Sequence, residues 1–289
     1  MALERQSTVL GRQLGETLRQ YRLTAAMSTT QAADALDCTK GKISRMENGR
    51  VLVRTPDVVA LLRAYGIADE DVHQRLSALA RAAHPRHQRG WWDEYAQALS
   101  HTYRDYIALE ALAEHVCNFQ PQVLPGLLQS PDYARALAVA RQDGRTDGEI
   151  EQFIHVRAAR QRRLAEEPLL TLSVVVTEGA VRQQIGGPKV WRAQMEHVLE
   201  VAQRPNITVR VLPFSASAYM CVNGPFLLLS FPKVSERDVA LCESPIGDMW
   251  REHDDDVALF RAGFDNATDV ALEPDESFSL LRRITKEYQ

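Results

Sequence analysis

The sequence predicts a multi-domain protein in which an all-α domain precedes a larger mixed α/β domain. Its 289 residues exceed one average domain of roughly 150 residues and fall short of three. Short helical patterns with capping residues fill the first part of the chain, whereas strand-like runs begin only near residue 169. The stretch at residues 84–90 interrupts both patterns. We therefore place the first domain at residues 1–85 and the second at residues 90–289.

The first domain is expected to hold five helices. Its first segment carries apolar side chains at three- and four-residue steps between polar ones, which is typical of an amphipathic helix. Ser28 or Thr29 caps a short second helix, and Thr39 caps a third that ends at Asn48-Gly49. Pro56 stands at the first turn of the fourth. The helices are expected at residues 9–23, 30–36, 40–47, 55–65 and 69–83.

The second and third helices form a predicted helix-turn-helix. Only Asp37 and Cys38 separate them. Two helices joined by so tight a turn fit the major groove of DNA, because the second enters the groove while the first braces against the backbone. Ile43 and Met46 lie three residues apart and are expected to face the core. The polar residues between them are therefore left for DNA.

Five basic residues in and after the third helix are the candidates for DNA contacts. Lys40 and Arg45 are expected to contact base edges, because both donate hydrogen bonds to guanine O6 and N7 and arginine does so bidentately. Lys42, Arg50 and Arg54 are expected to bind phosphates, which fix the register on DNA without selecting a sequence.

The charge distribution supports this interpretation. The net charge of the chain is −4, but residues 1–89 contain 14 Lys or Arg and 9 Asp or Glu, a local balance of +5. Within residues 39–54 the single acid is Glu47. We expect Glu47 to form an internal hydrogen bond or salt bridge rather than to contact a base. Only the N-terminal part of the chain has the basic character that DNA binding needs.

The segment at residues 39–49, Thr-Lys-Gly-Lys-Ile-Ser-Arg-Met-Glu-Asn-Gly, resembles the recognition helix of the phage Cro and repressor class, also called the xenobiotic-response-element type. In that family the helix opens with a hydroxyl cap, presents its next two positions to bases, buries an isoleucine and closes with Glu-Asn-Gly or Glu-x-Gly. Gly41 departs from this pattern, so either the backbone approaches DNA closely there or that base step is not contacted. The resemblance implies phosphate contacts from Thr29 and Thr39, base contacts from Lys40, Gly41 and Arg45, and lesser contacts from Lys42 and Ser44.

The second domain opens with helical patterns and continues with short runs that are rich in β-branched or aromatic residues and bounded by Pro, Gly or Asn. This alternation indicates a mixed α/β domain. The expected helices cover residues 93–97, 103–117, 131–141, 147–166, 189–203 and 274–287, and the expected strands cover residues 169–176, 207–212, 226–231 and 238–242.

Four motifs of this domain resemble the C-terminal domain found behind such helix-turn-helices in many actinobacterial regulators. They are Pro-Gly-Leu-Leu-Gln-Ser-Pro-Asp-Tyr-Ala at residues 125–134, Arg157-x-x-Arg160-Gln161, Thr-Glu-Gly at residues 177–179 and Val-Leu-Pro-Phe at residues 211–214. Members of that group often act beside a small partner protein in arrangements likened to antitoxins. The resemblance therefore implies a partner protein for this domain.

Glu178 and Glu243 are the candidates for a ligand pocket, because they lie just after the first and the last predicted strand and α/β domains commonly bind ligands at strand ends. Acid-base catalysis by this pair is the less favoured interpretation. No nucleophile elbow, phosphate loop or zinc-protease motif accompanies it. We therefore do not expect an enzyme.

No metal site and no cofactor are expected. His84 and His87 flank Pro85 and lack a third ligand nearby, while His253 and the three aspartates after it match a solvated helix start. The four cysteines lie far apart without Cys-x-x-Cys spacing. One further cluster is interpreted as a charged face of a long helix, with anion binding as the alternative: Arg157, Arg160, Arg162 and Arg163.

These patterns predict a sequence-specific transcriptional regulator that binds double-stranded DNA as a homodimer. Its second domain is expected to dimerise and to receive a signal from a small-molecule effector or a partner protein. The alternative is an antitoxin-like module that sequesters a small partner and autoregulates its operon. A cytoplasmic location without a membrane association is expected, because no apolar run approaches the roughly 18 residues that a bilayer span needs.

Overall fold

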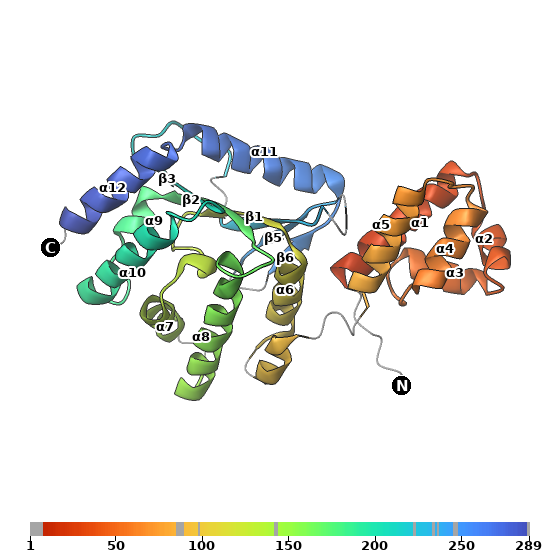
Figure 1. Cartoon of the computed structure of the whole chain (residues 1–289), viewed down its shortest axis with the longest axis horizontal. Helices are drawn as coiled ribbons and strands as arrows, with labels where there is room; N and C mark the ends of the chain where they lie inside the picture. Colours follow the sequence, from red (N-terminus) through yellow and green to blue (C-terminus); the bar gives the residue numbers. More distant parts are fainter. Residues whose placement is uncertain are drawn as a thin grey trace. The chain divides into compact units, whose positions relative to one another are not determined.

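The structure is a computed structural model that describes residues 8–84, 90–97, 99–141, 144–221, 224–232, 235, 237–244 and 248–287. It divides into two compact units (Figure 1). The helical unit comprises Met1–Trp91 together with Phe231–Arg237, and the sheet unit comprises Trp92–Ser230 together with Asp238–Gln289. The fold class is as the sequence predicts: an N-terminal helical domain with a helix-turn-helix, followed by a mixed α/β domain.

The helical unit contains the five expected helices, and side chains cap four of them. Thr8, Thr39 and Asp69 each accept a hydrogen bond from a backbone N–H of the following turn. Ser28, not Thr29, caps the second helix, in a reciprocal capping box with Gln31. The helices are α1 (Val9–Thr24), α2 (Thr29–Ala35), α3 (Lys40–Glu47), α4 (Thr55–Ala64) and α5 (Glu70–Ala82).

Two glycines let α1 approach the end of α3 closely. A Cβ atom on Gly15 would lie 2.4 Å from the carbonyl oxygen of Met46, which is closer than a real Cβ contact. Gly49 has a φ of +63° and would place a Cβ 2.8 Å from the Cα of Arg12. Any larger residue at either position would push the two helices apart. The core that forms around this approach includes Leu10, Leu14, Leu18, Ile43, Met46, Leu61, Leu62 and Leu79.

A buried ion pair fastens the same junction. Arg22 of α1 donates from Nε to Glu47 Oε1 (2.6 Å) and from Nη2 to Glu47 Oε2 (3.0 Å). Its Nη1 donates to the carbonyl of Met27 (2.7 Å). Both charged side chains are less than one-tenth exposed. Burial, aided by the charge of Glu47, also raises the pKa of the neighbouring Tyr65 to about 12. Glu47 is therefore an internal ion-pairing group, as expected from the sequence.

A mixed six-stranded sheet in the order β3-β2-β1-β4-β5-β6 organises the sheet unit. The first three strands are parallel, and β4, β5 and β6 extend the sheet antiparallel beyond β1. Phe119 of β1 pairs with Val175 of β2 on one side and with Phe226 of β4 on the other. The strands are β1 (His115–Gln120), β2 (Thr171–Thr177), β3 (Ile207–Leu212), β4 (Phe226–Ser230), β5 (Val239–Cys242) and β6 (Met249–Arg251).

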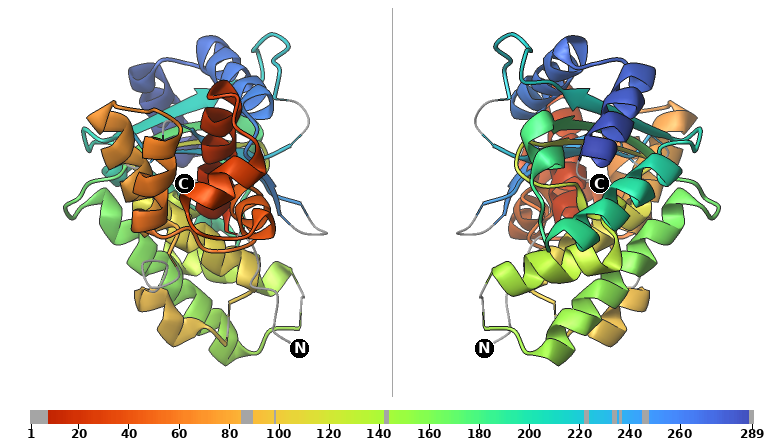
Figure 2. Two further views of the ribbon diagram at one scale, coloured as in Figure 1. Left: turned by 90° about the vertical axis from the view of Figure 1, so that its right-hand side faces the viewer. Right: turned by 90° about the vertical axis from the view of Figure 1, so that its left-hand side faces the viewer.

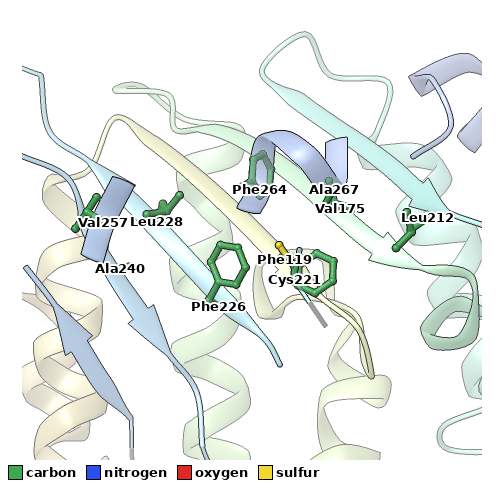
Figure 3. Close-up of a cluster of buried hydrophobic side chains, with 10 residues drawn as sticks. All are labelled: Phe119, Val175, Leu212, Cys221, Phe226, Leu228, Ala240, Val257, Phe264 and Ala267. Carbon is green, nitrogen blue, oxygen red and sulfur yellow. The ribbon is translucent and has the colours of Figure 1, made fainter. Parts of the chain in front are cut away.

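Helices cover both faces of the sheet. Figure 1 shows α11 on one face and α6, α7, α8 and α10 on the other, and two further views show the same layers (Figure 2). Under α11 the central strands form a hydrophobic cluster that includes Phe119, Val175, Leu228, Val257, Phe264 and Ala267 (Figure 3). The helices are α6 (His101–Leu112), α7 (Pro131–Ala140), α8 (Asp147–Gln161), α9 (Glu178–Arg182), α10 (Pro188–Val201), α11 (Asp254–Val270) and α12 (Pro274–Glu287).

Several elements differ from the sequence-based expectation. The helix predicted at residues 103–117 was wrong at its end, because α6 stops at Leu112 and the next residues form the central strand β1. Pairing with two neighbouring strands overrides the helical pattern there. The sequence indicated only the start of the helix α11, and the short elements α9 and β6 were not predicted. The helix expected at residues 93–97 is a 3-10 helix at Trp91–Tyr95.

Removing one partner of the buried ion pair should destabilise the helical unit. We expect Arg22→Met to lower the free energy of unfolding by about 3–5 kcal/mol, because Glu47 would remain buried without a counter-charge. Chemical denaturation followed by circular dichroism measures this loss. The double variant Arg22→Met/Glu47→Leu is the matched control, and it should recover most of the loss because it leaves no stranded charge. A loss below about 1 kcal/mol in the single variant, as for an exposed pair, would contradict the role of the pair.

Candidate nucleic-acid interface

The helix-turn-helix is formed by α2 and α3. The turn between them uses a left-handed residue, Asp37, with a φ of +47°, and the N–H of Cys38 donates to the carbonyl of Ala33 (2.9 Å). Ala32 and Ala33 are buried, so their small side chains allow α3 to pack closely on α2. The small residues of α2 and the tight turn after it thus determine the angle between α2 and α3.

The exposed side of α3 carries the residues expected to contact DNA. Ile43 and Met46 are buried, at 0% and 1% exposure. Thr39, Lys40, Ser44 and Arg45 are exposed, whereas Gly41 and Lys42 are partly exposed. The division predicted from residue spacing therefore matches the observed burial of this helix.

Thr39 and Thr29 stand at the two helix starts with different hydrogen bonding. The hydroxyl oxygen of Thr39 accepts from the backbone N–H of Lys42 (3.2 Å), which leaves its own hydrogen free for donation to a phosphate oxygen. Thr29 is the first residue of α2, directly after the capping Ser28, and its side chain is partly exposed. Both positions combine a helix N-terminus with a hydroxyl group, a combination that suits phosphate contacts.

Lys42 has an acidic neighbour that the sequence alone did not reveal. Its Nζ lies 3.7 Å from Asp57 Oδ2 in the first turn of α4, and both side chains are partly exposed. Such a pair is weak in solvent. Asp57 nevertheless competes with any phosphate for the Lys42 ammonium group. The two residues are distant in sequence, and no local pattern links them.

Gly41 lies beside the guanidinium group of Arg45. A Cβ on Gly41 would stand 3.6 Å from Arg45 Nη1 and 3.8 Å from Thr39 Oγ1, both ordinary contact distances. Arg45 therefore folds back along its own helix toward the position of Gly41. The free protein does not need a glycine there for packing, so any need for glycine at this position comes from a bound molecule.

Arg50 and Arg54 extend the basic surface beyond α3. Both are exposed, Arg50 directly after the Gly49 turn and Arg54 directly before α4. Because Glu47 is withdrawn into its ion pair with Arg22, the exposed charges of residues 39–54 are all positive. The surface presented by α3 and its following loop is thus more basic than the sequence count suggests.

Glu178 and Glu243 both lie at the carboxyl edge of the parallel strands but on different strands. Glu178 follows β2 and Glu243 follows β5, and the strand order places β1 and β4 between those two strands. Glu243 accepts a hydrogen bond from Gln120 Nε2 (2.9 Å). Glu178 accepts from the Phe214 N–H (2.9 Å) and from Arg182 Nε (2.7 Å). Each carboxylate therefore has its own partners within the fold.

The hydrogen bonds of Glu178 affect its ionisation. Burial by itself would raise the pKa of Glu178, but the Phe214 N–H and the Arg182 guanidinium outweigh it and hold that pKa below its usual value. The carboxylate is thus anionic at neutral pH and suits a structural contact better than proton transfer.

Among the described residues, no group of three or more His, Cys, Asp or Glu side chains is placed to hold a metal ion. His87 lies outside the described residues. The three aspartates after His253 occupy the first turn of α11, the helix start that their sequence indicates. In the same part of the chain, no helix has both the length and the apolar character needed to cross a bilayer.

Two protein-family models match the chain. Residues 13–76, which cover most of α1–α5, match a helix-turn-helix domain. Residues 103–283, more than half of the chain, match a domain of unknown function (DUF5753). No curated protein and no solved structure matches the sequence.

Replacing Gly41 tests whether a bound molecule needs the close approach that glycine allows. We expect Gly41→Ala to fold normally and to raise helix stability by up to about 1 kcal/mol, because alanine has the higher helix propensity and meets only ordinary contacts. Thermal unfolding measures the stability, and titration with DNA measures binding.

The two measurements separate the alternatives for Gly41. If the backbone approaches DNA at this position, affinity should fall although stability does not. Unchanged affinity would show that this base step is not contacted. A destabilised Gly41→Ala variant would contradict the ordinary contacts that a Cβ meets at this position.

Proposed function

Because the chain belongs to the DUF5753 domain family and carries a helix-turn-helix domain in front of that domain, we propose that it is a sequence-specific DNA-binding transcriptional regulator of the Cro/repressor type. The observation that carries the proposal is the exposed face of α3. That face presents Lys40, Ser44 and Arg45 to solvent while its one acid, Glu47, is buried.

In this proposal α3 is the recognition helix. Arg45 donates to guanine O6 and N7, and Lys40 contacts a neighbouring base edge near the start of the helix. Thr29, Thr39, Arg50 and Arg54 bind phosphates and set the register. Lys42 exchanges its weak contact with Asp57 for a phosphate, and Ser44 makes a minor polar contact. Gly41 allows the backbone to approach the groove.

We further propose that the regulator acts as a homodimer in the cytoplasm and that its larger domain controls it. A single helix-turn-helix buries too little surface for tight and specific binding. Two copies related by a two-fold axis contact half-sites about 34–36 Å apart on one face of DNA. The DUF5753 domain provides the dimer contacts and receives the signal in this proposal, and the function is regulatory rather than enzymatic.

Substitutions at Arg45 and Lys42 test the two kinds of DNA contact. Arg45→Ala should weaken binding to the preferred site by about 1–3 kcal/mol and relax specificity at one base pair. Lys42→Ala should weaken binding to all sequences and lower the salt slope by about one. Fluorescence anisotropy over a salt series, with a preferred and a scrambled duplex, measures both effects.

A substitution at Asp57 provides a control that should change DNA affinity in the opposite direction. Asp57→Asn removes the carboxylate that competes for Lys42, so affinity should rise for every sequence. Arg192→Ala, an exposed substitution in α10 of the sheet unit, should change nothing. Equal losses on preferred and scrambled DNA for Arg45→Ala would exclude its base-reading role.

A second candidate function is an antitoxin-like module that holds a small partner protein and autoregulates its operon. The observation that favours it is the exposure of large apolar side chains in the connection after β3, Phe214 at 71% and Met220 at 55%. Neighbouring contacts fix this connection, since Asn266 Oδ1 of α11 accepts from the Met220 N–H (2.9 Å). In this proposal the two side chains belong to one apolar patch of the kind that binds other proteins.

A capture experiment tests this second candidate. The full-length protein should retain one small host protein, and the variant Phe214→Ser/Met220→Ser should lose it while keeping its DNA affinity. Val139→Ser, which alters an apolar side chain of α7 that is 57% exposed, is the matched control. Equal retention by all three proteins would contradict a partner site at this connection.

A further inference from the structure

The arginines of α8 and its extension do not form one charged face, so that interpretation was wrong. Arg160 is buried and makes a bidentate ion pair with Glu110, and it also donates to the hydroxyl oxygens of Tyr103 and Tyr106. Arg163 donates to backbone carbonyls of α6 and the residue after it. These two cations serve the packing of α6 against α8, and every hydrogen bond that they donate ends on a group of the fold. The Nε of Arg163 is buried without a hydrogen-bond partner among the described residues.

Arg157, one turn before Arg160, is placed differently. Its Nη1 donates to the side-chain oxygen of Gln129, and its guanidinium carbon lies 4.6 Å from the centre of the Phe153 ring. A Cβ on Gly126 would stand 3.3 Å from the same carbon, so this glycine leaves room for the guanidinium group. The side chain of Arg157 also forms a hydrogen bond with Tyr103. The surroundings of Arg157 are thus an aromatic ring, a neutral amide, a tyrosine hydroxyl and bare backbone.

Among the residues that the structure describes, no acidic side chain contacts Arg157. Among the described residues Arg157 forms no ion pair, and its Nε is buried without a hydrogen-bond partner. Burial lowers the pKa of Arg157, and the nearby charge of Arg160 acts in the same direction, whereas Tyr103 and Glu243 oppose it. A cation withdrawn from water without a counter-charge is costly. Arg160 on the same helix pairs with the carboxylate of Glu110, and Arg163 donates to three backbone carbonyls. Within the described part of the chain, Arg157 has neither kind of acceptor and contacts only neutral side-chain groups.

The position of Arg157 in the fold is one where α/β domains bind ligands. Gly126 and Gln129 belong to the connection that follows β1. From β1 the chain continues to β2 and then β3 on one side of the sheet, and the later strand β4 lies on the other side of β1. The direction in which strands are added to the sheet therefore reverses at β1. Gln161 of α8 donates to the carbonyls of Gly126 (3.0 Å) and Gln129 (2.7 Å), which holds this connection against α8. The guanidinium group is therefore held in a fixed place, and its Nε is buried, while Arg157 as a whole residue is partly exposed.

A second arginine lies at the same ring. The guanidinium carbon of Arg145 is 5.0 Å from the centre of the Phe153 ring. Two guanidinium groups therefore lie against one phenyl ring.

We propose that Arg157 is the anchor of a binding site for a small oxyanion, either a carboxylate or a phosphate group of an effector molecule. The free Nε and the adjoining Nη present the fork of donors that binds such groups bidentately. Phe153 and Gly126 position the fork. This site would give the larger domain the effector that the proposed function requires.

Thermal unfolding of the full-length protein without DNA tests the site, with inorganic phosphate and succinate as separate probes at constant ionic strength. Each effective probe should raise the unfolding temperature in a saturable way. In Arg157→Met the apparent dissociation constant should increase about tenfold or more, because charge-assisted hydrogen bonds are lost. Arg157→Met should still fold, since no carboxylate is stranded. Arg192→Met is the control and should respond as the wild type does.

The outcomes are distinct. A response to phosphate alone identifies a phosphorylated effector, and a response to succinate alone identifies a carboxylate. No saturable response to either probe, or an equal response from Arg157→Met, would overturn the site. Because no DNA is present, failure here leaves the proposed DNA binding unaffected.

Discussion

The buried ion pair between Arg22 and Glu47 is the interaction on which the helical unit depends. The helix α3 has only eight residues, and isolated helices shorter than about 12–15 residues are marginal in water. Its stability must therefore come from its neighbours. The ion pair binds the last turn of α3 to α1, and Gly15 allows the two backbones to meet at that point. The exposed side chains of α3 are thus presented from a fixed helix.

The same interaction resolves the conflict between a net acidic chain and a proposed DNA-binding function. The overall charge of −4 says little about the surface that α3 presents, because its acid is neutralised inside the core. Asp57 remains beside Lys42 and partly neutralises its charge. A carboxylate that weakens a phosphate contact lowers affinity for all sequences alike, and this leaves discrimination to base contacts such as the one proposed for Arg45.

Local patterns in the sequence predicted what depends on local contacts. The cap at Thr39, the burial of Ile43 and Met46, and the tight turn after α2 all follow from spacing and residue type. Contacts between residues that are distant in the sequence left no local pattern from which they could be predicted. The strand β1 was predicted as the end of a helix because its identity comes from β2 and β4, which pair with it from distant positions. Arg22 and Glu47 are 25 residues apart, and Arg160 and Glu110 are 50 apart, so their partners emerged only in three dimensions.

The central proposal is that α3 contacts base edges in the major groove as part of a two-fold dimer. Protection of guanine N7 from methylation in bound DNA is the most direct measurement, because N7 lies in the major groove. We expect protected guanines in two half-sites about 34–36 Å apart. In the complex with Arg45→Ala, one guanine in each half-site should be methylated again. Unprotected guanines in the bound DNA, or protection that Arg45→Ala leaves unchanged, would contradict the proposal.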